Sequence, residues 1–241
     1  MTSQSKTELF TVRVEYAKRD RLRFIGHLDT ARLLVRGVRA AGLPARYTEG
    51  HSPHLDMSFG PALSLGHTGD SEFFDVRLTA PMGPAAIHDA LQTHMPEGIE
   101  VRSVRLIRGK PESLGVELNR AEYVVSLPAG VELASQAVEQ FMASDEVVVA
   151  RRRGGREKAI DVRRYVERLE MFDEPDGARR LEMAIVLTPE GSANPEEVLG
   201  ILTGGQAALG PGVRVHRERL YHGAAGGGLT ETELGRGSYV S

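Results

Sequence analysis

The stretch "FTVRVEYAKRDRLRFIGHLDTARLLVRGVRAAGLP", residues 10–44, decides the fold because a strand pattern is followed closely by a helix pattern. In its first seven residues apolar and polar side chains alternate, which is the period of a strand with one buried face. From residue 27 onward apolar side chains recur at helical spacing, and Gly42 and Pro44 end the helix. The stretch therefore predicts a β-α unit. The inward positions of its helix are Ala31, Leu34, Val35 and Val38.

The rest of the chain extends this unit and then repeats it. Two short strand patterns, a longer strand, a second helix and a closing strand complete the order β-α-β-(β)-β-α-β, which is the split βαβ or ferredoxin-like plan. A second half follows the same plan without obvious sequence identity, and Asn194 with Pro195 marks the beginning of its last helix. We expect an α+β protein of two tandem ferredoxin-like domains, residues 1–110 and 116–222. The alternative is a single mixed α+β sheet.

The composition excludes several function classes. Among 241 residues there is no cysteine, so disulfides, cysteine-ligated zinc, thiolate catalysis and an iron–sulfur cluster held by this chain alone are excluded. No apolar stretch is long enough to span a membrane, and the first ten residues lack the apolar core of a signal peptide. We expect a soluble cytoplasmic protein with no cofactor and no membrane partner. The Gly-rich segment 223–241 is expected to be a disordered tail.

A net charge of −3 hides two basic segments. Residues 11–47 contain nine Arg or Lys against three acids, and "ARRRGGREKAIDVRR", residues 150–164, forms the second segment. A basic segment is most often a solvated face. Two of them in a slightly acidic protein favour a partner that carries phosphates.

The first candidate site lies at the beginning of the first helix, in "LRFIGHLD". A helix N-terminus presents free N–H groups and attracts anions, so Arg23 and His27 beside it would form a pocket for a phosphate or a carboxylate. The alternative is structural: Asp29 caps the helix and His27 is a partly buried polar residue.

The second candidate site is "HSPHLDMSFGPALSLG", residues 51–66. His51, His54 and Asp56 have the chemistry of metal ligands, but two histidines three apart around a proline are not a recognised ligand spacing. Its glycines and prolines favour a hairpin whose backbone approaches a ligand closely. We therefore predict no metal, and a hairpin that shares a site with His27.

The third candidate is "REKAIDVRR", residues 156–164. If the segment is extended, Asp161 and Arg163 lie on one face and Arg164 on the other. The alternative is a charged edge strand, on which Lys158 and the arginines discourage aggregation. Phosphate-loop, dinucleotide-binding, zinc-protease and serine-hydrolase motifs are absent from the sequence.

These motifs resemble a known family. "LRFIGHLD" before a helix, then the pattern G-x-S-P-H-x-x-M-S-F-x-P-A-L-x-L-G and "EFFD", is similar to the radical-SAM-linked proteins. These are bacterial domains of unknown function that occur alone or fused behind a B12-binding radical SAM enzyme. The likeness is strong over residues 10–110 and continues through "KAIDVR" and "PEEVL". By position the family motifs fall on His27, Asp29, Pro53, His54, Ser58, Phe59, Glu72, Asp75, Asp161 and Arg163.

The resemblance implies a radical SAM enzyme as partner. The sequence itself has no CxxxCxxC motif, so this chain does not hold the radical SAM cluster. It departs from the family at His51, which replaces a frequent Phe, at Asp56, where a basic residue is common, and at Arg164, which replaces a usual Pro. The expected fold also resembles the RAMP-type RNA-processing proteins, some of which cleave RNA with a histidine near the first helix, and His27 falls roughly there.

Three functions follow. The leading hypothesis is a non-catalytic module that binds tRNA or rRNA and presents it to a separate radical SAM enzyme; the few aromatic residues argue against extensive base stacking. The second is a protein-interaction or small-molecule module that serves the same enzyme. The third is a metal-independent endoribonuclease with His27 as general base and Arg23 or Lys158 stabilising the phosphorane. The expected binding residues are Arg23, His27, Asp29, Pro53, His54, Ser58, Phe59, Glu72, Asp75, Lys158, Asp161 and Arg163.

Overall fold

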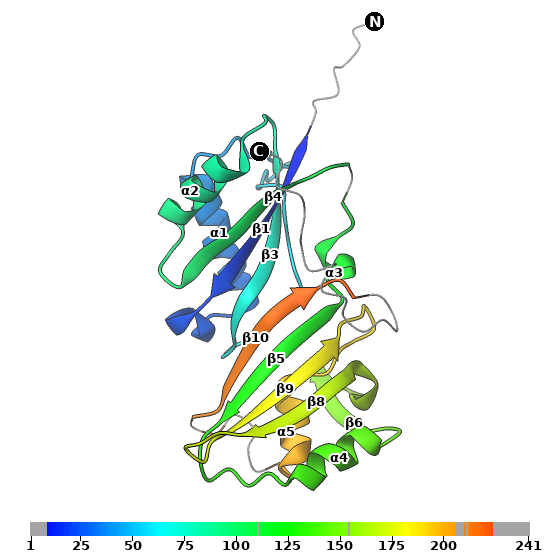
Figure 1. The fold of residues 1–241 in the computed structure, drawn as a ribbon. Coiled ribbons are helices and arrows are strands. Elements are labelled where there is room, and N and C mark those ends of the chain that lie inside the picture. The colour runs from blue at the N-terminus through cyan, green and yellow to red at the C-terminus, as the bar shows by residue number, and fades with distance from the viewer. Residues whose placement is uncertain (1–8, 110, 154, 206–209, 211, 224–241) are drawn as a thin grey trace, which may run out of the picture.

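The computed structural model describes residues 9–109, 111–153, 155–205, 210 and 212–223. It confirms the α+β class: a long twisted sheet runs through the molecule, with α1 and α2 beside its first-half strands and α4 and α5 beside its second-half strands (Figure 1). The elements of the first half are β1 (Phe10–Lys18), the 3-10 helix η1 (Asp20–Phe24), α1 (His27–Ala40), β2 (Met57–Phe59), β3 (Thr68–Leu78), α2 (Pro84–His94) and β4 (Ile99–Ile107).

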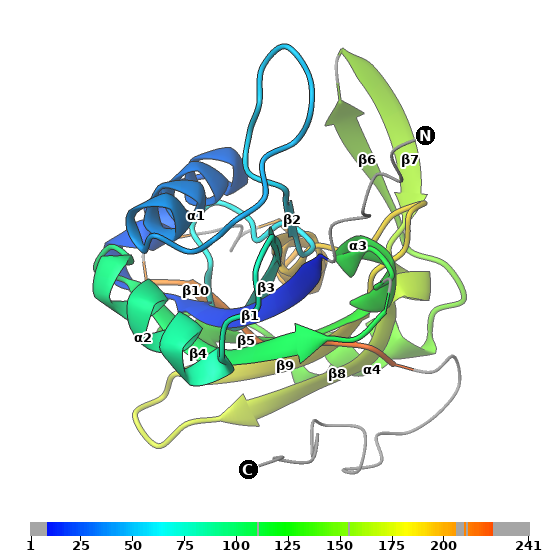
Figure 2. The ribbon, with the colours of Figure 1, turned by 90° about the horizontal axis from the view of Figure 1, so that it is seen from above.

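The second half adds a hairpin to the same kind of element order. Its elements are α3 (Leu114–Glu117), β5 (Arg120–Leu127), α4 (Ser135–Ala143), β6 (Val148–Arg153), β7 (Arg156–Asp161), η2 (Arg163–Tyr165), β8 (Val166–Asp173), β9 (Arg179–Val186), α5 (Pro195–Leu202) and β10 (Arg214–Tyr221). Strands β6 and β7 pair with each other and form a separate two-stranded sheet among the described strands. This hairpin projects from the body on the same side as the loop between α1 and β2 (Figure 2).

The two halves share one sheet. Its order is β4-β1-β3-β10-β5-β9-β8, with β2 also on β3, which makes eight strands in the part of the chain described. Its pairs are antiparallel apart from β3 with β10, which run parallel and are in register at Thr68–His216 and Gly69–Arg217. The single mixed sheet, which the sequence offered as the alternative, is therefore how the two halves are joined. The finer prediction of two tandem ferredoxin-like domains stays a prediction, as do the domain boundaries.

Some local predictions need adjustment. The segment after α1, expected to begin with a strand, makes isolated bridges at Ala45 and Tyr47, since Pro44 and the bend at residues 50–52 interrupt its pairing. α3 begins at Leu114, inside the segment 111–115 that separates the two expected domains. Apart from Gly223, the expected tail lies outside the described residues.

Each half has its own apolar core, and the cores are built by the predicted alternation. On β1 the side chains of Val12 and Val14 are fully buried and pack with Leu34 and Val38 of α1. In the second half, strands β5, β9 and β10 pack with α4 and α5. Phe73 of β3 belongs to the second core, so apolar packing crosses the junction between the halves.

Buried ion pairs also cross this junction. The Arg217 guanidinium of β10 is 1% exposed and donates from Nε to Glu72 Oε1 of β3 over 2.8 Å, with a second contact from Nη2 to Oε2. It also donates to the carbonyl of Pro61 at 2.9 Å. Burial alone would lower the pKa of Arg217, but Glu72 and Tyr123 together raise that pKa above its ordinary value. The guanidinium therefore stays charged.

We predict that Glu72→Gln lowers the free energy of unfolding by about 3–5 kcal/mol, because it leaves a buried guanidinium without its counter-charge. Urea unfolding followed by circular dichroism measures this loss. The double variant Glu72→Leu with Arg217→Met should recover part of this loss, since apolar residues of similar size replace the ion pair but leave the carbonyls of Pro61 and Ala62 without their donor. As a control, Arg102→Gln, which breaks the surface pair of Arg102 with Glu100, should cost less than about 1 kcal/mol. A similar cost for Glu72→Gln and Arg102→Gln would contradict the prediction.

Candidate functional site

The beginning of α1 is open to solvent on one side and faces a pocket on the other. Gly26 is the N-cap residue, and no side chain within the described ranges caps the helix there. Asp29, which the sequence offered as a cap, instead accepts a hydrogen bond from Arg32 Nη1 at 2.8 Å on the exposed outer face. Thr30 is buried and donates from Oγ1 to the Gly26 carbonyl at 3.0 Å. The helix therefore places His27 and Thr30 toward the sheet and Asp29 away from it.

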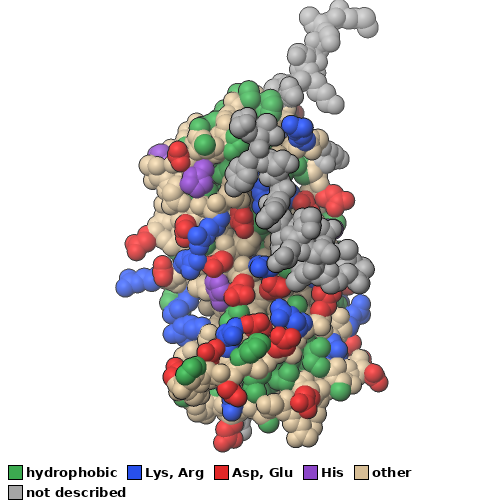
Figure 3. Space-filling view, viewed as in Figure 1, with side chains coloured by type: hydrophobic (Ala, Val, Ile, Leu, Met, Phe, Trp, Pro, Cys, Tyr) green, Lys and Arg blue, Asp and Glu red, His purple; other side chains and the backbone are tan. Residues whose placement is uncertain are grey.

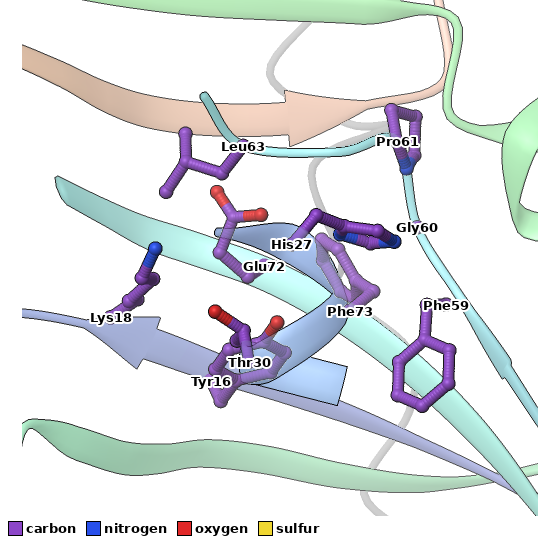
Figure 4. Close-up of a pocket in the computed structure, with 10 residues that line it drawn as sticks. All are labelled: Tyr16, Lys18, His27, Thr30, Phe59, Gly60, Pro61, Leu63, Glu72 and Phe73. Carbon is purple, nitrogen blue, oxygen red and sulfur yellow. The ribbon is translucent and has the colours of Figure 1, made fainter. Parts of the chain in front are cut away.

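The pocket lies between α1, the segment after β2, and strands β1 and β3 (Figure 4). The cavity has a volume of about 10 Å³ that the centre of a water molecule can reach. This is close to the volume that a single water molecule needs. A typical metabolite does not fit in this arrangement. The lining residues are Tyr16, Lys18, His27, Thr30, Phe59, Gly60, Pro61, Leu63, Glu72 and Phe73.

Lys18 is the cation of this pocket. Its residue is 1% exposed, and its Nζ donates to the carbonyl of Ile25 at 2.9 Å. Burial lowers its pKa, Glu72 opposes that effect and Arg217 adds to it, so the pKa of Lys18 lies below its ordinary value. Beside it, burial and then Glu72 raise the pKa of Tyr16, which keeps the phenol protonated. The pocket thus combines an amine, a carboxylate and a hydroxyl donor.

His27 lies at the other side of the pocket, with its ring edge toward Phe59 at a centroid distance of 6.3 Å. Burial lowers its pKa below 6.5; Glu72 opposes this effect, while Arg217 and Lys18 add to it. The imidazole is therefore neutral near pH 7 and has a ring nitrogen that can accept a proton.

Of the residues expected from the sequence, His27, Phe59 and Glu72 meet in this pocket. Arg23 lies next to it: its carbonyl accepts from Gly66 N at 2.7 Å, which ties the segment after β2 to η1. Asp75 belongs to the opposite face of β3, where it accepts from Arg13 Nε at 2.9 Å. Its neighbour in this network is Glu117 of α3, which also contacts Arg13.

Pro53 and His54 lie elsewhere. Backbone hydrogen bonds from Thr48 N to the His54 carbonyl at 2.8 Å and from Asp56 N to the Arg46 carbonyl at 2.9 Å close a loop whose exposed tip contains both residues. The expected hairpin is thus present, but it closes before the pocket begins. Of the stretch 51–66, Phe59, Gly60, Pro61 and Leu63 line the pocket, while Ser58 is exposed.

The second-half motif has structural roles. The Asp161 carboxylate accepts from Val147 N at 3.0 Å and from Arg163 N at 3.1 Å, which fixes the base of the β6–β7 hairpin. The Arg163 guanidinium donates to the carbonyls of Met142 and Val166. Lys158, in contrast, is exposed on β7.

Three titratable residues at the pocket were missed: Tyr16, Lys18 and Arg217, the last through its contact with Glu72. The alternation of β1 continues through Tyr16 to Lys18 and so places both on the buried face, a signal that was available. Arg217 is 145 residues from Glu72, and nothing in the sequence indicates that contact. His67 is buried beside β3, and its Nε2 contacts Glu196 of α5 across the junction.

Two kinds of feature are absent from the described residues. No helix among them is both long and apolar enough to cross a membrane. They also contain no cluster of three or more His, Asp or Glu side chains suited to hold a metal ion.

Comparisons with known proteins identify a family without an assigned activity. A family model described as "Uncharacterized protein conserved in bacteria (DUF2344)" matches residues 11–195. No curated protein matches.

Solved structures provide a more distant likeness. A Cbf5-Nop10-Gar1 complex has a chain with 12% identity and a TM-score of 0.43, over 89% of this chain and 50% of that one. An H/ACA RNP bound to a substrate RNA gives 11% identity and a TM-score of 0.41, over 90% of this chain and 49% of that one. An archaeal box H/ACA sRNP Nop10-Cbf5 complex gives 12% identity and a TM-score of 0.41, over 87% of this chain and 48% of that one. The chain thus spans about half of each. Likeness at this level carries no argument about function.

We predict that an NMR titration of the His27 ring gives a pKa below 6.5. The unfolded chain then takes up a proton that the folded protein excludes, so the free energy of unfolding should fall as the pH drops from about 7 to about 5. Unfolding of the protein and of His27→Gln at several pH values isolates this contribution, because the variant lacks it. An identical pH dependence in both proteins would contradict the burial of His27.

Proposed function

The chain belongs to the DUF2344 family of uncharacterized proteins conserved in bacteria, and from that premise we propose that it is a non-catalytic module that binds RNA. By its resemblance to the radical-SAM-linked proteins, the proposed module presents tRNA or rRNA to a separate radical SAM enzyme. One observation carries the RNA part of the proposal: two basic elements, α1 with η1 and the β6–β7 hairpin, lie on the same side of the sheet (Figure 2).

The first basic element is formed by η1 and α1. Residues 20–40 contain five arginines and two aspartates, an excess of three positive charges. Arg32 is paired with Asp29, but Arg36 and Arg39 are exposed and have no acidic partner among the residues described. Both lie on the outer side of α1, where a polyanion can approach.

The second basic element is the β6–β7 hairpin. In its register Arg151 is opposite Lys158, so the two side chains share one face. Arg151 is neutralised by Glu197 of α5, to which its Nε donates at 2.6 Å, and this contact fixes the hairpin against the body. Arg156 and Lys158 are exposed, and within the described chain neither has an acidic partner. Figure 2 shows the hairpin and α1 on the same side, with the α1–β2 loop between them.

The opposite side of the sheet has a different charge pattern. In Figure 3 acidic and basic side chains are interspersed on that face. Arg168, for example, lies within 4 Å of three carboxylates, those of Glu122, Glu170 and Glu182. Paired charges offer little to a polyanion, whereas unpaired arginines and lysines release counterions when they contact phosphates. The helix side is therefore the proposed RNA-binding side.

We also propose that each half is a ferredoxin-like unit. The strand order in the first half is β4-β1-β3-β2, and the corresponding order in the second half is β10-β5-β9-β8. In each half one helix follows the strand that comes first in the chain (α1 after β1, α4 after β5) and another follows the third (α2 after β3, α5 after β9). Strand order and helix positions together support the split βαβ plan. In this interpretation the β6–β7 hairpin is an insertion after α4.

A second candidate function is a metal-independent endoribonuclease. The neutral His27 and the buried Lys18 line one pocket, which supports a general base and a cation at the same place. Lys18 is then a better candidate than Lys158 to stabilise a phosphorane, since Lys158 lies on the hairpin of the other half. The remaining hypothesis is a protein-interaction or small-molecule module that serves a radical SAM enzyme, and the pocket at His27, which holds about one water molecule, gives the small-molecule form no support.

We predict that the double variant Arg156→Gln with Lys158→Gln weakens RNA binding and makes its salt dependence shallower. Removal of two cations that bind phosphates should reduce the slope of log affinity against log salt by about 1.4 to 1.8. Filter binding or anisotropy with tRNA and rRNA fragments at several salt concentrations measures this. The matched control is Arg102→Gln with Arg105→Gln on the edge strand β4, which removes the same charge and should leave the slope unchanged. Equal effects of both pairs would reject a hairpin-specific contact.

For the nuclease candidate, we predict that His27→Ala lowers any RNA cleavage rate by about 10²- to 10⁴-fold while RNA affinity is largely kept. Cleavage of end-labelled RNA in the presence of EDTA gives the rate. His54→Ala, at the exposed loop tip, serves as the control and should cleave normally. Cleavage that survives in His27→Ala would eliminate this candidate.

A further inference from the structure

Phe24, the last residue of η1, is 63% exposed. Most of the apolar surface of this ring is therefore left in water, which is unfavourable for an aromatic side chain. A single exposed apolar residue needs no explanation by itself. Phe24, however, lies three residues before the pocket residue His27, in the short 3-10 helix that leads into the basic helix α1.

The ring is also covered in part by a cation. The Arg23 guanidinium carbon lies 4.6 Å from the centroid of the Phe24 ring. No carboxylate of the described chain pairs with Arg23. The charge of a guanidinium that lies over an aromatic ring can still attract a phosphate. The uncovered part of the ring can stack with a planar group such as a base.

The backbone that carries this pair is held in place. Ile25 N donates to the Leu22 carbonyl at 3.1 Å, and Gly66 N donates to the Arg23 carbonyl at 2.7 Å. Lys18 Nζ holds the Ile25 carbonyl at 2.9 Å. One local contact and two contacts from other parts of the chain thus fix the backbone around Phe24, so little backbone ordering is needed when a ligand binds.

A second Arg–Phe pair provides a comparison within the same chain. The Arg180 guanidinium carbon lies 4.7 Å from the ring centroid of Phe172, which is 37% exposed. Arg180 is neutralised there: its Nε donates to Glu174 at 3.0 Å, and its Nη1 contacts Glu182. The two pairs therefore share geometry but differ in charge and exposure. Of these two, the pair at Phe24 is the one that offers an open ring and an unpaired cation together.

We propose that Phe24 and Arg23 form a stacking site for one unpaired RNA base, with Arg23 contacting a neighbouring phosphate. This inference rests on the proposed RNA binding and names its substrate class: RNA with an unpaired nucleotide, such as a loop or a bulge, rather than a continuous duplex. Unpaired bases expose a face that stacks on an aromatic ring, and duplex bases do not. One such site agrees with a chain in which aromatic residues are only 5%.

The test uses the full chain and two RNAs of equal length, a hairpin with 2-aminopurine in its loop and a fully paired duplex. Phe24→Ala should bind the loop RNA about tenfold more weakly and bind the duplex unchanged, since base stacking on an aromatic side chain has about that effect. Phe24→Tyr should retain both the affinity and the change in 2-aminopurine fluorescence. The matched control is Phe172→Ala, which should behave as the unaltered protein.

The outcomes separate this inference from the proposed function. If the unaltered protein binds neither RNA at low salt, the proposed RNA binding is rejected. If it binds both RNAs and Phe24→Ala changes neither affinity, RNA binding stands and the stacking site is overturned. A changed oligomeric state of Phe24→Ala with unchanged RNA affinity would also overturn it and assign the ring to a protein interface. The variant Arg23→Gln keeps Phe24 and should lose part of the affinity for the loop RNA. This result would support the site independently of the ring substitution.

Discussion

The contact between Glu72 and Arg217 is the constraint on which the rest of the structure depends. Strands β3 and β10 are in register at two residue pairs, so the ladder alone provides a short junction between the halves. The bidentate ion pair lies at this junction and is almost fully buried. Because a buried guanidinium needs its carboxylate in one geometry, the pair fixes the position of one half against the other.

The same contact determines the character of the pocket. Glu72 is engaged by Arg217, so its charge is largely compensated before any ligand arrives. Lys18 then adds a positive charge that no carboxylate within 4 Å balances among the described residues. A pocket with one excess cation, a neutral imidazole and room for about one water molecule is suited to the edge of an anionic ligand. This agrees with a polyanion that lies across the surface better than with an enclosed metabolite.

The sequence reveals local structure far better than it reveals the site. The alternation in β1 and the helical spacing in α1 predicted both elements, and Asn194 with Pro195 marked the beginning of α5, where Asn194 N donates to Glu197 at 3.2 Å. These signals act within a few residues. Arg217 pairs across 145 residues, and its neighbours in the sequence describe only a strand. The roles of Asp161 and Arg163 were hidden for the same reason, since their partners lie on other elements and are backbone groups.

The edge of β3 is shared by two strands: β2 pairs with residues 74–76 and β10 with residues 68–69. The chain that connects β2 to β3 must therefore leave one part of this edge and return to the other, and on the way its carbonyls at Pro61 and Ala62 meet the guanidinium of Arg217. Separation of the halves would deprive these carbonyls of their donor and leave residues 68–69 of β3 without a partner on this edge. A chain cut between the halves would therefore expose these carbonyls and the Glu72 carboxylate, which are hydrogen-bonded to Arg217 in the joined protein.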